Sequence, residues 1–327
     1  MTTNIRLFTP ADYPAIVNIH NSLNIVWPEQ PRTPEGWAEV DRNRNPRCKI
    51  QRWVAIQDGV IAGYGVYWQS NFDYHPQRFY INVEVSPQFQ RCGLGAALYD
   101  QILSALQPFD PRVLRANAFT NLPAGFPFLQ QRGFYEAFRE TPVHLDIAGF
   151  DPSPYADLEA KLCSRGVVIK TLREVENDPG YAHKLYDLYW EATADVPQEE
   201  PRIEQQEFAE WVKWGLNDPT ILHDAYFVAI CGDETIGLRE LSKDPDNNIL
   251  LGGLLGVRRD YRGQGIGLAM QLRGIAYCRE HGYPQLKTCT AIQNAPMQAM
   301  FDKLGYARDP EWLQCQKNFV ALNGSVS

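Results

Sequence analysis

The 327-residue sequence lacks the features of a membrane protein and of a disulfide-stabilised secreted protein. It contains no run of about 18 apolar residues, and residues 1–9 include no apolar signal segment. Its seven cysteines are odd in number, scattered and without a C-x-x-C pair, a pattern typical of reduced thiols. We therefore expect a cytoplasmic protein.

The sequence also lacks an excess of positive charge and any motif for a metal site. Lysine and arginine number 31 against 39 aspartates and glutamates, for a net charge of -8, which disfavours nucleic acid as a partner. The six histidines form no H-E-x-x-H pattern or other paired spacing, so we expect no metal site. A small anionic ligand can still bind where backbone amides converge.

An internal duplication is present instead. The segment 85–95 aligns with 257–267 at an offset of 172 residues, and Gly133 aligns with Gly305 at the same offset. A chain of this length is expected to form about two domains. A segment rich in Gly, Pro and Asp, 149–154, resembles a linker. We therefore predict an N-terminal domain over residues 1–150 and a similar C-terminal domain over 151–327.

The same order of elements is expected in both halves. A strand (5–8; 167–172) precedes an amphipathic helix (14–23; 181–194), and a short helix at 155–163 opens the second half. Two strands joined by a tight turn follow (53–57 and 60–68; 226–231 and 235–241). A further strand (79–85; 249–257) leads into a Gly-rich loop and a helix, which runs over 266–281 in the second half. This mixture of strands and helices predicts an α/β (α+β) fold.

The Gly-rich loops have the form Gln or Arg, two residues, Gly, one residue, Gly, between a strand and a helix. Glycines let the backbone turn tightly, and the amides at the start of a helix attract an anion. A P-loop would need Gly-Lys-Ser or Gly-Lys-Thr, and a dinucleotide fingerprint would need a third glycine where Leu98 and Leu268 stand. A nucleotide-dependent enzyme is therefore disfavoured.

The loop at 257–267, together with Asn294 and the later Leu-Gly-Tyr at 304–306, resembles the GCN5-related N-acetyltransferase (GNAT) family. The resemblance covers both halves and implies two tandem GNAT domains, each with a mixed, mostly antiparallel central sheet flanked by helices. It implies an N-acetyltransferase that moves an acetyl group from acetyl-CoA directly to an amine. A non-catalytic acyl-CoA-binding or sensing protein is the alternative.

The resemblance also implies roles for individual residues. Amides that hold the pyrophosphate of acetyl-CoA would come from Gln90, Arg91, Cys92, Gly93, Leu94 and Gly95, and from Arg262, Gly263, Gln264, Gly265, Ile266 and Gly267. The backbone of Val83, Val85, Leu255 and Val257 would bind pantetheine and polarise the thioester carbonyl. Asn294 would help to hold the cofactor.

The catalytic groups are less clear from the sequence. The family often has a tyrosine as general acid where this chain has Phe301. Candidates for the general base are Glu84, on the strand that enters the first loop, and Glu240 and Asp195 in the second half. The loops at 27–29 and 195–197 would line the acceptor cleft. The closer loop match favours the second half as the catalytic one. We expect a small-molecule amine as acceptor rather than a protein, and a monomer or homodimer.

Overall fold

The computed structural model describes residues 4–23, 31–71, 74–197, 205–244 and 246–319. Their contacts divide the chain into two compact units. The first unit contains the described residues up to Glu140 together with those from Pro310 on, and the second contains those from Thr141 to Asp309. Each unit is described by itself below.

The first unit is built on a sheet with the strand order β1-β2-β3-β4-β5-β13-β6. Its strands are β1 (Asn4–Leu7), β2 (Ile50–Gln57), β3 (Val60–Trp68), β4 (Arg78–Val85), β5 (Val113–Phe119), β13 (Trp312–Asn318) and the start of β6 (Tyr135–Asp146). Neighbouring strands are antiparallel except β4 and β5, which are parallel. Its helices are α1 (Tyr13–Ser22), α2 (Pro34–Arg42), α3 (Leu94–Leu106) and α4 (Gly125–Gln130).

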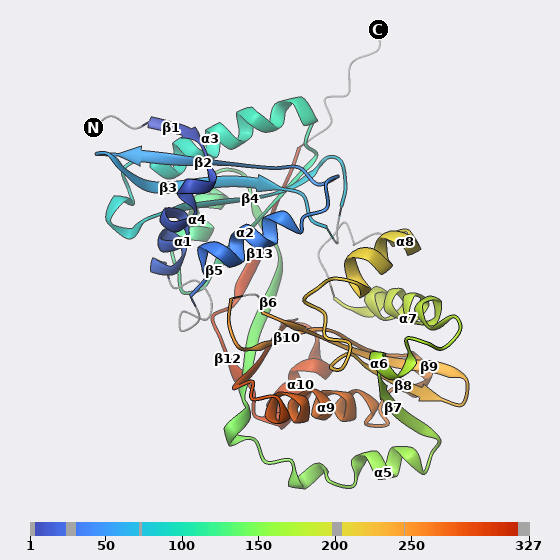
Figure 1. Cartoon of the computed structure of the whole chain (residues 1–327). Coiled ribbons are helices and arrows are strands. Elements are labelled where there is room, and N and C mark those ends of the chain that lie inside the picture. The colour runs from blue at the N-terminus through green and yellow to red at the C-terminus, as the bar shows by residue number, and fades with distance from the viewer. Residues whose placement is uncertain (1–3, 24–30, 72–73, 198–204, 245, 320–327) are drawn as a thin grey trace. The chain divides into compact units, whose positions relative to one another are not determined.

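Side chains that alternate along β2 and β3 place apolar residues on both faces of this sheet. Val54, Tyr64 and Val66 are buried against α1. Trp53, Ala55 and Tyr67 point to the opposite face and are buried against α3. Successive side chains in a strand alternate between faces, so helices on both sides are needed to cover the two apolar sets. Figure 1 shows α3 on one side of these strands and α1 with α2 on the other.

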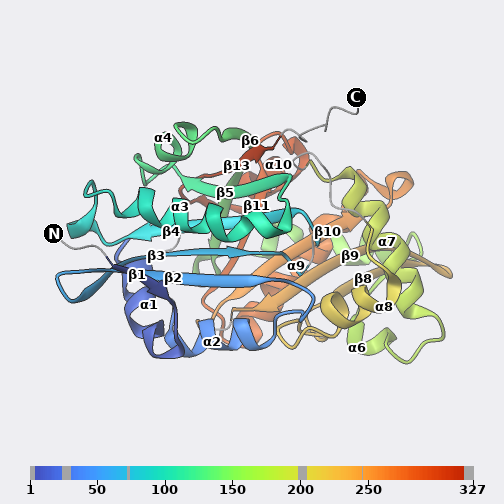
Figure 2. The same ribbon diagram turned by 90° about the horizontal axis from the view of Figure 1, so that it is seen from above.

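The second unit repeats this plan with the strand order β7-β8-β9-β10-β11 followed by β6, whose residues from Thr141 on belong here. Its other strands are β7 (Val167–Thr171), β8 (Phe227–Cys231), β9 (Glu234–Lys243), β10 (Leu250–Val257), β11 (Gln285–Ala291) and β12 (Ala307–Arg308). Its helices are α5 (Leu158–Cys163), α6 (Leu172–Val175), α7 (Tyr181–Asp195), α8 (Phe208–Trp211), α9 (Ile266–Glu280) and α10 (Ala295–Leu304). A π-helical turn, Val212–Leu216, continues α8. Figure 2 shows α7 beside β8 and β9.

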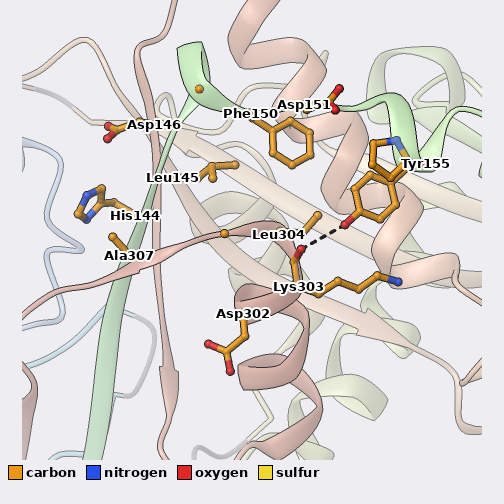
Figure 3. Close-up of a pocket in the computed structure, with 13 residues that line it drawn as sticks. His144, Leu145, Asp146, Phe150, Asp151, Tyr155, Asp302, Lys303, Leu304 and Ala307 are labelled. Atoms are coloured by element: carbon orange, nitrogen blue, oxygen red, sulfur yellow. Dashed lines mark hydrogen bonds between the residues drawn. The ribbon is translucent and has the colours of Figure 1, made fainter.

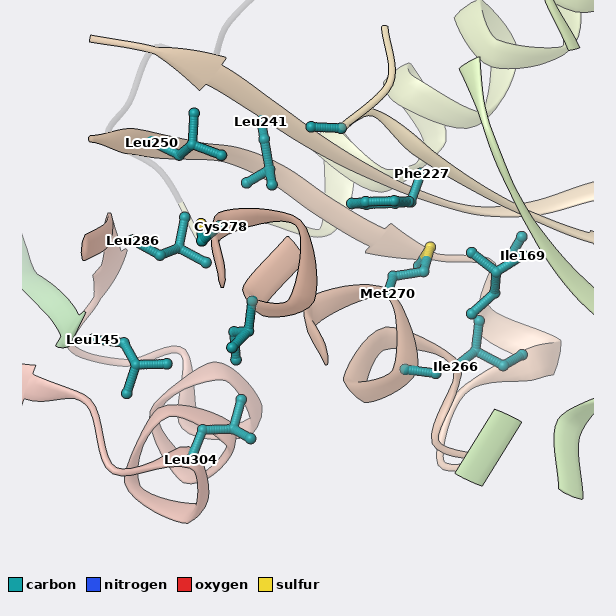
Figure 4. Packing of buried hydrophobic residues seen from close by; sticks show 14 of the residues in the cluster. Leu145, Ile169, Phe227, Leu241, Leu250, Ile266, Met270, Cys278, Leu286 and Leu304 are labelled. Carbon is teal, nitrogen blue, oxygen red and sulfur yellow. The ribbon is translucent and has the colours of Figure 1, made fainter. Parts of the chain in front are cut away.

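The core of the second unit lies between α9 and the sheet. Figure 4 shows Ile266 and Met270 of α9 facing the strands that carry Phe227 and Leu241. These side chains are at most 3% exposed. Burial of each contributes about 1.5–3 kcal/mol relative to an exposed position. Because Ile266 is the first residue of α9, this burial holds the start of the helix against the sheet. The Gly-rich loop that precedes α9 is thereby held at the end of β10.

The fold class and the repeated order of elements confirm the predictions from sequence. The predicted elements agree with the observed ones to within one to three residues in most cases, as for α7 and β10. In the first half the stretch 123–127 contains prolines, and the short helix α4 begins within it at Gly125.

The last strand of the chain has an unexpected place. β13 belongs to the first unit, where it pairs with β5 from Trp312 opposite Phe119 to Asn318 opposite Val113. It also pairs with β6, from Trp312 opposite Glu140 to Gln316 opposite Tyr135. The compact units therefore do not follow a single cut near residue 150. The domain boundary predicted there remains a prediction about the two copies of the duplicated sequence.

Candidate active sites

In each unit the two parallel strands of the sheet separate before the Gly-rich loop. β4 and β5 are paired only from Arg78 to Tyr80, and β10 pairs with β11 only at Leu250 and Leu251. Beyond these residues no ladder pair joins β4 to β5 or β10 to β11. Backbone N–H and C=O groups that are not used in the sheet are strong hydrogen-bonding groups. Val83, Val85, Leu255 and Val257 all lie in these stretches, so their backbone is placed where a ligand could pair with it.

The two loops have nearly the same backbone. Gly263 and Gly265 have φ of 75° and 88°, and the equivalent residues of the first unit are Arg91 at 64° and Gly93 at 84°. These values lie in the left-handed region, where glycine is unstrained and a side chain is disfavoured. Arg91 therefore adopts, with a side chain, the conformation for which the second loop uses glycine.

Both loops end at the open N-terminus of a long helix. Gly93 caps α3 and Gly265 caps α9, and neither helix start has a side-chain cap. The first N–H groups of a helix have no partner within the helix, and they carry the positive end of its dipole. Such a terminus at a Gly-rich turn fits the pyrophosphate of an acyl-CoA.

In each loop one side chain donates a hydrogen bond to the carbonyl at the end of the preceding strand, a contact called the brace below. Gln90 donates from Nε2 to the Val85 carbonyl at 3.1 Å, and Arg262 donates from Nε to the Val257 carbonyl at 2.8 Å. The two contacts are equivalent under the offset of 172 residues. The first unit therefore keeps the brace although glutamine replaces arginine.

Asp195, at the end of α7, binds two arginines of the second loop. Its carboxylate accepts from Arg262 Nη2 at 2.6 Å and from Arg259 Nε at 2.9 Å, with a further bond from Arg259 Nη2. These partners, above all Arg259, hold the pKa of Asp195 well below its usual range. A carboxylate stabilised as an anion in this way is a weak base, so the contacts favour a role in ordering the loop.

The strand β10 carries a β-bulge that β4 lacks. Its register against β9 shifts between Gly252 and Leu255, whereas β3 and β4 pair continuously from Gly63 to Trp68. Arg239 donates from Nη1 to the Gly253 carbonyl at 2.8 Å, and Thr288 donates from Oγ1 to the Gly252 carbonyl at 2.9 Å. A bulge turns backbone groups out of the ladder and is common beside active sites.

Glu240 lies directly beside this bulge. The Leu254 amide hydrogen-bonds its carboxylate, and a Cβ added at Gly253 would lie 2.8 Å from its Cδ. Burial raises the pKa of Glu240 to about 7, although the neighbouring charge of Arg239 and the Leu254 amide act in the opposite direction. Tyr189 is a close neighbour, and the pKa of this phenol is raised by burial and by the Glu240 charge.

Glu84, the candidate of the first unit, is buried and has several partners. It lies on β4, is 5% exposed, and accepts from Asn82 Nδ2 at 2.8 Å. His20 of α1 approaches it with Nδ1 at 3.0 and 3.1 Å from the two carboxylate oxygens. Sequence reasoning did not single out His20, because it is separated from Glu84 by 64 residues and belongs to no motif.

The remaining predicted positions have local roles in the structure. Asn294 caps α10 by accepting from the Met297 amide at 3.4 Å. Phe301 is 1% exposed and packs in the core beside Tyr306. Cys92 is exposed, and its Sγ lies 3.5 Å from the Gln90 carbonyl oxygen. The loop predicted at 27–29 lies outside the described residues, whereas Val196 and Pro197 follow α7 directly.

A cleft of about 440 Å³ lies in the second unit, among the end of β6, the segment after it and the end of α10 (Figure 3). Phe150 and Tyr155 stack in it, and the Tyr155 hydroxyl donates to the Lys303 carbonyl at 3.2 Å. The cleft contains none of the residues predicted to bind acetyl-CoA.

The described residues contain neither a cluster of metal ligands nor a helix that could cross a membrane. Nowhere in them do three or more His, Cys, Asp or Glu side chains gather closely enough to bind a metal ion. Within the same ranges, no helix has both the length and the apolar character to cross a membrane.

Comparison with known proteins decides the family. The model of the acetyltransferase (GNAT) family matches twice, over residues 15–134 and 182–306. The chain belongs to the GNAT acetyltransferase family. Each match contains one Gly-rich loop, with the strand before it and the helix after it, so the duplication is one of whole GNAT modules.

Similar GNAT proteins extend over most of the chain. It is 24% identical over 241 residues to the mycothiol acetyltransferase of Thermobifida fusca (strain YX), which covers 68% of this chain and 70% of that one. It is 26% identical over 265 residues to the mycothiol acetyltransferase of Rhodococcus opacus (strain B4), covering 79% and 80%.

Solved structures share the tandem fold. A GCN5-related N-acetyltransferase from Sphaerobacter thermophilus superposes with a TM-score of 0.72 at 17% identity, covering 97% of this chain and 95% of that one. A tandem GNAT protein from the clavulanic acid biosynthesis pathway gives 0.71 at 18% identity, covering 97% and 98%. Family membership and these relatives make the chain an N-acetyltransferase that uses acetyl-CoA as the acetyl donor.

Proposed function

We propose that the second GNAT unit catalyses acetyl transfer to the amine of a small molecule, with Glu240 as general base. One observation carries the proposal: a carboxylate with a pKa of about 7 lies at the bulge of β10, where the parallel strands have separated. A general base works best when its pKa is near the working pH. A substantial fraction of the base is then ionised, and its affinity for a proton is still high.

The chemistry needs such a group. An alkylamine with a pKa of about 10.4 is protonated at pH 7 and must lose a proton to become a nucleophile. In the proposed reaction Glu240 takes this proton and passes it to water, and the free amine then attacks the acetyl carbonyl. As the C–N bond forms, the nitrogen loses a second proton to Glu240, and the C–S bond breaks to release coenzyme A as a thiolate. The thiolate then takes a proton from solvent, since a thiol with a pKa of about 8.5 leaves without a strong acid. The reaction then does not require the tyrosine general acid that the family often has where this chain has Phe301.

The loop of the same unit would hold the donor. Amides from Arg262 to Gly267 would bind the pyrophosphate, and the backbone of Leu255 and Val257 would pair with pantetheine and polarise the thioester carbonyl. The corresponding loop of the first unit, Gln90 to Gly95, has the same open helix terminus and is proposed to bind acetyl-CoA as well.

The acceptor is proposed from two lines of support. The relatives named as mycothiol acetyltransferases act on a small molecule. In this chain, an ammonium group would be attracted by the Glu240 carboxylate, with Tyr189 beside it. A cytoplasmic location belongs to the same proposal and is favoured by the odd number and scattered positions of the seven cysteines.

The test is a pH–rate profile of the purified protein with acetyl-CoA and a panel of small primary amines, following release of coenzyme A. We expect kcat/KM to rise with pH through about 7 and Glu240→Gln to lower kcat by about 10²-fold or more. Acetyl-CoA affinity should change little, because the substitution leaves the loop intact.

Asp233→Asn is the matched control. Asp233 is an exposed carboxylate in the turn just before β9, and its loss should leave turnover unchanged. Full activity of Glu240→Gln, or an equal loss in both variants, would refute the assignment of the base.

A further inference from the structure

We infer that the first GNAT unit contains a second acetyl-transfer site, in which His20 is the general base and Glu84 positions it. The inference goes beyond the proposed function, since it concerns the other unit and a different kind of base. It begins from the contact between α1 and β4, close to the end of β4 where the first Gly-rich loop starts.

Glu84 has the surroundings of a positioning carboxylate. It is 5% exposed and accepts hydrogen bonds from Asn82 and from His20, and Tyr64 is its cross-strand neighbour. Burial and the adjacent Glu84 charge raise the pKa of Tyr64, so this phenol stays a donor. Two donors converge on one buried carboxylate, which fixes its position.

His20 is oriented by this carboxylate. Nδ1 lies 3.0 and 3.1 Å from the two oxygens of Glu84, so Nδ1 carries the proton that is donated. The lone pair of the neutral ring is then on Nε2, which bonds to none of the residues that the structure describes. The ring lies 5.3 Å from Trp37, and the side chain is 25% exposed. A histidine held at Nδ1 by a buried carboxylate, with Nε2 accessible, is the arrangement in which imidazole acts as a general base.

The second unit shows that the fold does not require this pair. The offset of 172 residues places Ala192 and Gly256 at the positions of His20 and Glu84. They also touch, since a Cβ added at Gly256 would lie 2.4 Å from the Ala192 Cβ. The same helix–strand contact is therefore made by the two smallest side chains in one unit and by a hydrogen-bonded histidine and glutamate in the other.

The candidate carboxylates of the two units also lie on different strands of the sheet. In the second unit Glu240 comes from β9, and in the first Glu84 comes from β4, the strand that leads into the loop. The loop of the first unit keeps its brace from Gln90 and its uncapped helix terminus. Each unit thus combines a donor loop with its own base, and the different bases indicate different acceptors.

The step proposed for the first unit is a transfer from acetyl-CoA to a primary amine. The amine nitrogen attacks the acetyl carbonyl carbon as His20 Nε2 takes the proton that the amine loses. The C–S bond breaks, coenzyme A leaves as a thiolate that is protonated by solvent, and Glu84 stabilises the imidazolium until it returns its proton to water.

The experiment isolates the first unit by disabling the second loop with Gly265→Asp. Release of coenzyme A from acetyl-CoA is followed with a panel of primary amines. We expect turnover with part of the panel to persist in Gly265→Asp. His20→Ala in this background should lower kcat by about 10²-fold or more, with the KM for acetyl-CoA unchanged. Added imidazole should restore part of the lost rate, which a purely structural role of His20 would not allow.

His144→Gln is the matched control, since it removes a histidine of the second unit that is likewise bonded at Nδ1 by a carboxylate, that of Asp309, at 3.0 and 3.1 Å. It should leave turnover unchanged. The inference is overturned if Gly265→Asp abolishes turnover with every amine, if His20→Ala keeps its rate, or if imidazole restores nothing to a His20→Ala variant of unchanged melting temperature. If Gly265→Asp instead keeps the whole wild-type rate, the proposed function of the second unit fails and the site in the first unit stands.

Discussion

Replacing Glu240 by glutamine should stabilise the second unit, and only above a defined pH. Burial raises the pKa of Glu240 from 4.5 to about 7, so the folded protein favours its neutral form. Below about pH 4.5 the group is protonated in both folded and unfolded chains and contributes no pH dependence. Between pH 4.5 and 7 the unfolded chain loses the proton while the folded chain keeps it, and the free energy of unfolding falls.

The magnitude follows from this difference in pKa. At about 1.4 kcal/mol per pKa unit, wild-type protein should lose up to about 3 kcal/mol between pH 4.5 and pH 8. Glutamine resembles the neutral acid and can still accept from the Leu254 amide, so Glu240→Gln should not lose this amount. The expected result is no stabilisation of the variant at pH 4.5 and up to about 3 kcal/mol at pH 8.

The assay is urea unfolding of wild type and Glu240→Gln at several pH values between 4.5 and 8, with the difference in transition midpoints as the readout. Asp233→Asn serves as the control because that exposed side chain meets water in both the folded and the unfolded chain, and its difference from wild type should stay nearly constant. A Glu240→Gln difference that is flat with pH, or that becomes destabilising as the pH rises, would refute the reasoning. The same substitution is expected to lower kcat, so the base is maintained at a cost in stability.

Three further predictions concern the loops and the last strand. Gly265→Asp puts an anion into the proposed pyrophosphate site at a φ of 88°, so isothermal titration should show one acetyl-CoA bound per chain where wild type binds two. Unchanged stoichiometry would exclude this loop. Asp195 orders the loop through Arg259 and Arg262, so Asp195→Asn should raise the Kd for acetyl-CoA by up to about fivefold, or about 1 kcal/mol or less; a lower Kd would mean that Asp195 chiefly competes with pyrophosphate for Arg262. A fragment ending at residue 150 lacks β13 and should give no dispersed NMR spectrum, whereas the same fragment extended by residues 310–319 should fold better.

The repeated motif is what made the fold and the loops predictable. Two copies of one loop, each between a strand and a helix, restrict the choice of fold far more than either copy alone. The glycines at 263 and 265 are needed for their left-handed backbone, and that requirement is visible in the sequence. Glu84 and Glu240 could be named as candidates because the strands that carry them were predictable.

The groups that decide the chemistry depend on contacts between distant residues. His20 meets Glu84 across 64 residues, and Asp195 meets Arg262 across 67. Neither contact has a periodic pattern that marks it in the sequence. The raised pKa of Glu240 results from burial beside the bulge of β10, and a bulge depends on pairing with a neighbouring strand. The place of β13 could not be predicted either, because the alternation of apolar and polar residues in a strand does not indicate which strands it will pair with.

The position of β13 sets the order in which this chain can be completed during synthesis. The first unit leaves the ribosome with β5 and β6 formed from residues 113–140, while the strand that fills the space between them begins only at Trp312. At about 5–20 residues per second, the roughly 170 residues in between take about 8–35 s to make. During that time the nascent sheet exposes two unpaired edges, which are templates for wrong pairing. A stop codon between residues 141 and 311 therefore removes a strand from the first unit.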